Sequence, residues 1–286
     1  DPNSEAISIA TVFRQADSDP KGFILFNPGG PGASGYDWVK DSSEFLGTKA
    51  LRADWNILGF DPRGVGRSSA VWCLSDSEYD EFLYGVSGSD IGTEEDITAA
   101  REATAEFASK CLENTGPLLE FVDTVSAAKD MDVLRAVIGQ SKLNFLGYSY
   151  GSFLGTTYAT LFPERVGRFV LDGAIDPTVS DFEQTLFQIE AFESALSAFL
   201  ENCDTYEDCP FTGNVPADLE TIQALLLSIE DTPLPTASGR DLTIWGAVTG
   251  LIMTLYSDRY WSALATAFNE ALSGTGDEFL SLADFY

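Results

Sequence analysis

The stretch Gly-Tyr-Ser-Tyr-Gly at residues 147–151 places one serine between two glycines, each two positions away from it. A short apolar run, 142–146, precedes this stretch, and an apolar segment with helical spacing, 151–162, follows it. Glycines at these positions permit a strained, tight turn from strand to helix, which lifts the serine Oγ clear of a sheet. The pattern therefore predicts that Ser149 is a nucleophile, rather than an incidental serine in a glycine-rich turn.

A serine hydroxyl needs a neighbouring base to become reactive, and the chain contains no histidine. Lys142 begins the strand that Ser149 ends, so an extended chain would hold it about 20 Å away. Asp172 and Asp176 are expected to have structural or substrate roles, because an aspartate with an ordinary pKa of about 3.9 is a poor base for a hydroxyl. We find no substitute base in the sequence.

A second glycine-rich stretch, Asn-Pro-Gly-Gly-Pro-Gly-Ala-Ser-Gly at residues 27–35, follows the apolar run 22–26. Backbone N–H groups of such a loop can stabilise an oxyanion, together with the N–H of the residue after the nucleophile. Gly30 and Tyr150 are therefore the predicted oxyanion donors.

A plain connecting loop stays open as one alternative for these glycines. Dinucleotide binding is another, because residues 30–35 also fit the Gly-x-Gly-x-x-Gly pattern of dinucleotide-binding loops. Asp61 closes the next strand, where an acid that binds a ribose would be expected. Against this alternative, Pro28 and Pro31 remove backbone donors from the loop, and the pattern leaves Ser149 without a role.

The charge balance excludes some partners. The chain has 45 Asp and Glu against 16 Lys and Arg, a formal charge of −29 that repels nucleic-acid phosphates and anionic lipid alike. No apolar run approaches the ~20 residues that cross a bilayer, and the first residues lack the features of a signal peptide. We expect a soluble chain from which any signal peptide is already removed, with neither nucleic acid nor membrane as a partner.

The four cysteines predict two local disulfides, Cys73 with Cys111 and Cys203 with Cys209. Free buried thiols are the alternative. A zinc site is not expected, because closely spaced Cys-x-x-Cys pairs and histidines are both missing, and no other metal or cofactor is expected. Disulfides favour secretion or another oxidising compartment. The cytoplasm stays an alternative, since no Asn-x-Ser/Thr glycosylation signal supports secretion.

Apolar periodicity predicts the elements that position these residues. Short apolar runs with little alternation predict strands buried on both faces of a sheet, at 55–60, 142–146 and 168–172. The runs 7–13 and 22–26, separated by a polar turn, predict a hairpin, and helices are expected at 124–139 and 151–162. This order predicts the α/β class, with a doubly wound, mostly parallel sheet.

Strand-like runs disappear after about residue 178, where helical stretches predominate. We therefore predict a core at 1–177 and an inserted helical cap at 178–286. Five aromatic residues are expected chiefly to fill the core of this cap, rather than to line a lid over Ser149: Phe187, Phe192, Trp245, Tyr256 and Trp261.

Three stretches together resemble the tripeptidyl aminopeptidase and prolyl aminopeptidase branch of the α/β-hydrolases: FNPGGPGASG (26–35), WNILGFDPRGVGRSS (55–69) and LGYSYGSFLGTTYATLFPERVGRFVLDGAIDP (146–177). The likeness runs along most of residues 5–177. It implies an incomplete α/β-hydrolase core with Ser149 as the nucleophile and with Gly30 and Tyr150 at the oxyanion.

The resemblance also bears on the residues around this site. It implies that Asp61 and Arg63 brace loops rather than react. Asn27 departs from the histidine usual in prolyl aminopeptidases, although the tripeptidyl branch commonly has asparagine there.

In that family the catalytic aspartate and histidine follow later strands, beyond the cap. The resemblance therefore implies that this sequence is truncated at both ends. Its expected partners are a C-terminal remainder that carries the Asp and His, and a peptide or small acyl substrate.

The predicted function is a serine hydrolase, an exopeptidase that releases N-terminal residues or short peptides through an acyl-enzyme, with this chain alone inactive. An esterase or lactonase and a non-catalytic fragment stay open, because a fold does not fix its substrate.

Overall fold

The computed structural model describes residues 6–85, 88 and 91–286. Contacts divide the chain into two compact units, the first with residues up to 74 and 105–178, the second with 75–104 and 179–286. The predicted core and cap differ from these units in the segment 75–104, which packs with the second unit. The role of the second unit as a cap stays a prediction.

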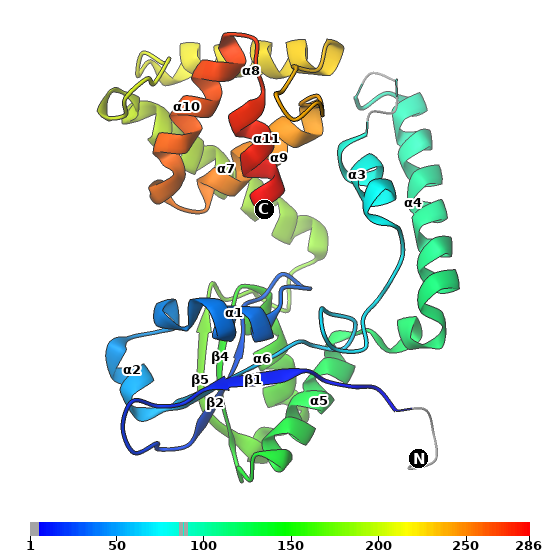
Figure 1. Cartoon of the computed structure of the whole chain (residues 1–286), viewed down its shortest axis with the longest axis vertical. Coiled ribbons are helices and arrows are strands. Elements are labelled where there is room, and N and C mark those ends of the chain that lie inside the picture. Colours follow the sequence, from blue (N-terminus) through cyan, green and yellow to red (C-terminus); the bar gives the residue numbers. More distant parts are fainter. Residues whose placement is uncertain (1–5, 86–87, 89–90) are drawn as a thin grey trace. The chain divides into compact units, whose positions relative to one another are not determined.

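In the described residues, the first unit contains one five-stranded sheet in the order β1-β3-β2-β4-β5. Figure 1 labels β1, β2, β4 and β5 of this sheet. The strands are β1 (Thr11–Arg14), β2 (Phe23–Asn27), β3 (Asn56–Phe60), β4 (Leu143–Tyr148) and β5 (Val166–Asp172). All neighbours are parallel except β1 and β3, which are antiparallel. The predicted mostly parallel α/β sheet is confirmed.

The predicted hairpin between residues 7–13 and 22–26 is wrong. β1 pairs with β3, with Thr11 opposite Phe60 and Arg14 opposite Ile57, and β2 pairs with the other side of β3. The Ala16 N–H donates to the buried Asn56 Oδ1 at 2.9 Å, which holds the segment after β1 against the start of β3. The segment between β1 and β2 therefore passes across β3 instead of forming a tight hairpin turn, because β3 lies between the two strands in the sheet.

Helices cover both faces of the sheet. In the first unit they are α1 (Gly35–Ser42), α2 (Lys49–Asp54), the later part of α4 (Glu94–Thr115), α5 (Thr124–Val137) and α6 (Tyr150–Leu161). Successive β2 residues alternate between faces, so that Phe26 packs in a cluster with Val39 of α1, and Leu25 in a cluster with Met131 of α5 and Leu154 of α6. This two-sided burial explains the unbroken apolar runs of the central strands.

β5 differs from the prediction of a strand buried on both faces. It lies at one edge of the sheet in the described residues, with β4 as its neighbour. Its residues are half-buried or exposed, and Val170 is 54% exposed.

The described part of the second unit is helical, with a short bridge between Leu234 and Leu242. Its helices are α3 (Asp76–Tyr84), the start of α4, α7 (Asp181–Glu201), α8 (Val215–Asp231), α9 (Ile244–Leu255), α10 (Trp261–Leu272) and α11 (Asp277–Phe285). Buried aromatic residues centre its core: Phe199, Phe211, Phe268 and Phe279.

The five aromatic residues predicted for the core of the cap divide into two groups. Phe192 and Trp261 pack against the core of the second unit, as expected. Phe187, Trp245 and Tyr256 are 55%, 41% and 57% exposed, so the prediction is wrong for these three.

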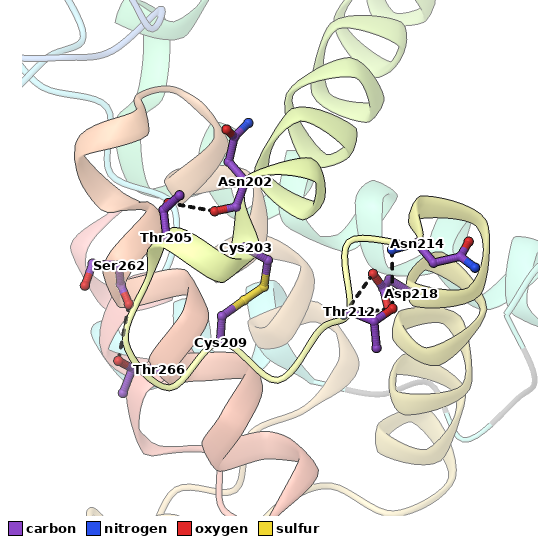
Figure 2. The surroundings of a disulfide bond; sticks show 9 residues. All are labelled: Asn202, Cys203, Thr205, Cys209, Thr212, Asn214, Asp218, Ser262 and Thr266. Atoms are coloured by element: carbon purple, nitrogen blue, oxygen red, sulfur yellow. Dashed lines mark hydrogen bonds between the residues drawn. A yellow bond between two sulfur atoms is a disulfide. The ribbon is translucent and has the colours of Figure 1, made fainter.

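Both predicted disulfides are present. Cys73–Cys111 lies in the first unit and Cys203–Cys209 in the second. Figure 2 shows the second bridge within a loop whose backbone is held by side chains, including the Thr205 hydroxyl, which donates to the Asn202 carbonyl at 2.7 Å.

None of the described helices combines the length and the apolar character that are required to span a membrane.

We predict that loss of the Cys73–Cys111 bridge destabilises the first unit more than loss of Cys203–Cys209 destabilises the second. The bridges span 38 and 6 residues. Each bridge lowers the conformational entropy of the unfolded chain, which stabilises the folded state by about 4 kcal/mol for the longer loop and about 2 kcal/mol for the shorter one. Urea unfolding of the two double Cys→Ala variants, followed by hydrogen exchange in each unit, measures both losses. Equal losses would contradict the prediction.

Candidate active site

Ser149 lies between the end of β4 and the start of α6, with φ 52° and ψ −121°. This conformation is uncommon for a residue with a side chain and costs of order 1–3 kcal/mol. A Cβ at Gly147 would lie 2.4 Å from the Gly151 carbonyl oxygen, and a Cβ at Gly151 would lie 2.7 Å from the Asn27 carbonyl oxygen. The close approach of three backbone segments thus requires the two glycines around the serine.

Hydrogen bonds hold the backbone of Ser149 on both sides of its Cα. Its N–H donates to the Asp172 carbonyl at 2.8 Å, at the end of β5. Its carbonyl accepts from the Ser152 N–H at 2.8 Å and from Ser152 Oγ at 2.6 Å. Ser149 itself is exposed in the described structure, so a held backbone presents an accessible hydroxyl.

The loop after β2 lies against this turn. β2 and β4 are parallel neighbours with Asn27 opposite Gly147, so both strands end at the same edge of the sheet. A Cβ at Gly29 would lie 3.0 Å from Ser149 Cβ and 3.1 Å from the Tyr150 nitrogen. The structure therefore brings the predicted oxyanion loop and the predicted nucleophile together.

Gly30 and Tyr150, the predicted oxyanion donors, lie next to these contacts. Tyr150 is the first residue of α6, so its N–H has no acceptor within the helix. Gly30 directly follows Gly29 and has a φ of 105°. Their joint action on an oxyanion stays a prediction.

Asn27, noted in the sequence only as a departure from histidine, shapes the oxyanion loop. It is 1% exposed, and its Oδ1 accepts the Gly29 N–H at 3.0 Å. This bond closes the first turn of the loop, so the asparagine holds Gly29 against the serine.

Asp61 braces the loops, as the resemblance implied. It is fully buried and accepts from Ser34 Oγ at 2.6 Å, from the Tyr36 N–H at 3.1 Å and from the Arg67 N–H at 2.9 Å. A carboxylate enclosed by three donors of its own chain has no access to a ribose. The dinucleotide-binding alternative is therefore wrong.

Arg63 braces a second contact. Its guanidinium forms two hydrogen bonds to Asp130 of α5, at 2.8 and 2.7 Å, and a third to the Phe121 carbonyl at 3.2 Å. The hydrogen bond to Asp130 raises the pKa of Arg63, so the guanidinium keeps its positive charge throughout the physiological range. Beside it lies a cleft of about 450 Å³, lined by Ala6, Ile7, Arg63, Ser69, Thr115, Pro117, Leu118 and Phe121. This cleft is separate from Ser149, Gly30 and Tyr150.

The structure also places the three residues that the sequence analysis considered as substitutes for the missing base, Lys142, Asp172 and Asp176. Lys142 precedes β4, at the end of the strand opposite to Ser149. Asp172 lies opposite Tyr148 in the sheet, and it is its backbone carbonyl that meets the serine. Hydrogen bonds from the Thr178 hydroxyl and backbone N–H hold the pKa of Asp176 below its ordinary value, which makes it a still weaker base.

Two neighbouring hydroxyl groups were missed in the sequence. Ser152 lies in the first turn of α6, where a hydroxyl can bond back to the carbonyl three residues earlier, and this spacing was a usable signal. Thr124 Oγ1 shares a 2.8 Å hydrogen bond with the Tyr150 hydroxyl, and burial raises the pKa of Tyr150. No local pattern indicated that contact, because it joins two helices.

Comparison with known proteins gives a family match and several relatives. The sequence model of a family described as the alpha/beta hydrolase fold matches residues 22–274. The chain is 34% identical to the serine protease Hip1 of Mycobacterium tuberculosis, over 100% of this chain and 56% of that protein. It is 38% identical to a tripeptidyl aminopeptidase of Streptomyces lividans, over 62% of this chain and 33% of that protein.

A third relative carries a different name. The chain is 32% identical to the carboxylesterase B of M. tuberculosis, over 100% of this chain and 55% of that protein. The chain thus spans about half the length of the curated relatives that it matches throughout.

We predict that Gly29→Ala destabilises the first unit by about 1–3 kcal/mol more than Gly32→Ala. Both glycines have a positive φ, 101° and 106°, so backbone strain is common to the two variants. A Cβ at Gly29 would lie 2.6 Å from the Tyr148 carbonyl oxygen, whereas a Cβ at Gly32 meets open space. Urea unfolding of the two variants compares them, and equal losses would show that Gly29 is not held closely against the turn that carries Ser149.

Proposed function

The chain belongs to the α/β-hydrolase fold family, and from this premise we propose that it carries the nucleophile of a serine exopeptidase. The observation that carries the proposal is the strained, doubly held and exposed Ser149 beside the glycine loop. Strained backbone conformations of this kind cluster at active sites, and here the conformation presents a hydroxyl at the carboxyl edge of the sheet. A non-catalytic role would leave this conformation without a purpose.

In the proposed reaction, Ser149 Oγ attacks a substrate carbonyl and forms an acyl-enzyme, which water then hydrolyses. The N–H groups of Gly30 and Tyr150 stabilise the negative charge on the tetrahedral oxygen. In acylation a base takes the serine proton and gives it to the leaving group, and in deacylation the base takes a proton from the attacking water and returns it to Ser149 Oγ. The chain contains no histidine, so the base must come from outside these residues.

We assign that base, and the acid that orients it, to a C-terminal remainder of the same protein. The length of the relatives supports this assignment, since the chain accounts for 56% of Hip1. The edge of β5 supports it as well, because an exposed strand with a half-solvated apolar residue, Val170, is suited to pair with a further strand.

Peptides are the proposed substrates, since the relatives include proteins named serine protease and tripeptidyl aminopeptidase. We propose cleavage near a peptide N-terminus, with release of single residues or short peptides. Ester hydrolysis is the second candidate, and the likeness to a protein named carboxylesterase supports it.

Secretion, or another oxidising compartment, is the proposed location. Its support is the pair of disulfides, one in each unit, which a reducing cytoplasm would not maintain.

We predict that the full-length protein that carries this sequence labels at Ser149 with a fluorophosphonate and hydrolyses aminoacyl and tripeptidyl amides. Ser149→Ala should abolish labelling and lower kcat by about 10⁴- to 10⁶-fold, because the hydroxyl forms the acyl bond. Ser141→Ala is the matched control, since this exposed serine lies before the opposite end of β4 and should leave both readouts unchanged. Intact-mass analysis and amide hydrolysis measure the two effects.

The outcomes separate the candidates. Turnover of simple esters without amides would select the esterase. A full-length protein that neither labels nor turns over either substrate would overturn the hydrolase proposal. Full activity of residues 1–286 alone would show that a base exists within them.

A further inference from the structure

We propose that the Ser152 hydroxyl is a positioning group that aims the Tyr150 N–H at the oxyanion formed on Ser149. The proposal rests on the function proposed above. Ser152 follows the Gly-x-Ser-x-Gly motif directly and lies in the first turn of α6. It does not touch the reacting atoms, and it acts through the peptide group that joins Ser149 to Tyr150.

The Ser152 hydroxyl is buried and is used both as a hydrogen-bond donor and as an acceptor. The side chain is 1% exposed. Its single hydrogen is donated to the Ser149 carbonyl at 2.6 Å, because the other acceptor nearby, the Gly173 carbonyl, is 3.5 Å away. Its oxygen accepts the Ile175 N–H at 2.9 Å. The hydroxyl therefore joins the turn that carries the serine to the segment that leaves β5.

The geometry of a peptide group turns this contact into a positioning role. The carbonyl of Ser149 and the N–H of Tyr150 belong to one planar trans peptide, so they point in opposite directions. Ser152 holds the carbonyl with both its N–H and its Oγ, and thereby fixes the direction of the N–H at the far side. That N–H is the predicted oxyanion donor, so a tilt of the peptide plane would misdirect it.

The role of the hydroxyl differs from that of the Ser152 N–H. A bond from N–H three residues along is ordinary at a helix start and leaves the carbonyl some freedom to tilt. The second bond at 2.6 Å, from a hydroxyl itself anchored by Ile175, restricts that freedom. Donors aimed at the developing charge stabilise the transition state, so their loss lowers kcat more than it changes KM.

The test uses Ser152→Ala in the full-length protein. We expect kcat per fluorophosphonate-titrated site to fall about 10- to 100-fold, as for small misplacements of catalytic groups, with KM changed less than about threefold. A peptide boronic acid, which forms a tetrahedral adduct with Ser149, should lose affinity by the same factor as kcat/KM. Because kcat is expressed per titrated site, a loss of folded protein does not lower it. A merely structural role of Ser152 would therefore leave this value unchanged.

Thr157→Val is the matched control. Thr157 lies in the same helix and also donates its hydroxyl to a carbonyl, that of Phe153 at 2.9 Å, so its loss should leave kcat and boronate affinity unchanged. Ser152→Cys keeps the shape with a weaker donor, so its kcat should fall between those of wild type and Ser152→Ala. It also serves as the test if Ser152→Ala does not fold.

The outcomes distinguish this inference from the proposed function. If wild type labels and turns over but Ser152→Ala keeps its kcat, or loses kcat and the affinity of a non-covalent product equally, the positioning role is wrong and the function stands. If wild type itself neither labels nor turns over, both are wrong.

Discussion

A residue with a side chain stays in the left-handed region of backbone space only where its surroundings hold it there. At Ser149 the holding partners come from two further elements, the end of β5 and the first turn of α6. The conformation of the serine therefore depends on the pairing of β4 with β5 and on the position of the first turn of α6. The crowding that admits only glycine at 147 and 151 follows from the same convergence.

Polar side chains largely removed from solvent support the loops around this point. Asp61 accepts hydrogen bonds from Ser34, from the start of α1 and from the turn after β3, and Arg63 ties the same turn to Asp130 of α5. The Arg63–Asp130 pair is about 85% shielded from solvent, since its side chains are 15% and 14% exposed. Removal of one partner would leave the other charge buried alone, which is strongly unfavourable. These charged residues thus serve as scaffold, while the chemistry is left to Ser149.

The elements around the serine could be predicted because their signals are local. An apolar run, two glycines and helical spacing follow one another without interruption between residues 142 and 162. The pairing of β1 could not be predicted in this way. The turn residues after it favour pairing with the next strand, β2, and do not indicate that β3, which comes later in the sequence, pairs with β1 instead. Ser152 illustrates the same limit: its hydroxyl faces Ile175, from a segment beyond another helix and strand. The exposed Phe187, Trp245 and Tyr256 show that apolar character alone does not assign a residue to a core.

The Cys73–Cys111 bridge has a topological consequence for the segment 75–104. The chain leaves the first unit after residue 74, packs with the second unit and returns before residue 105, between two covalently joined points. A protease cut within this excursion would leave the pieces in one covalent molecule, and they would separate only on reduction. Under oxidising conditions the disulfide therefore keeps together two pieces of chain whose peptide connection is broken.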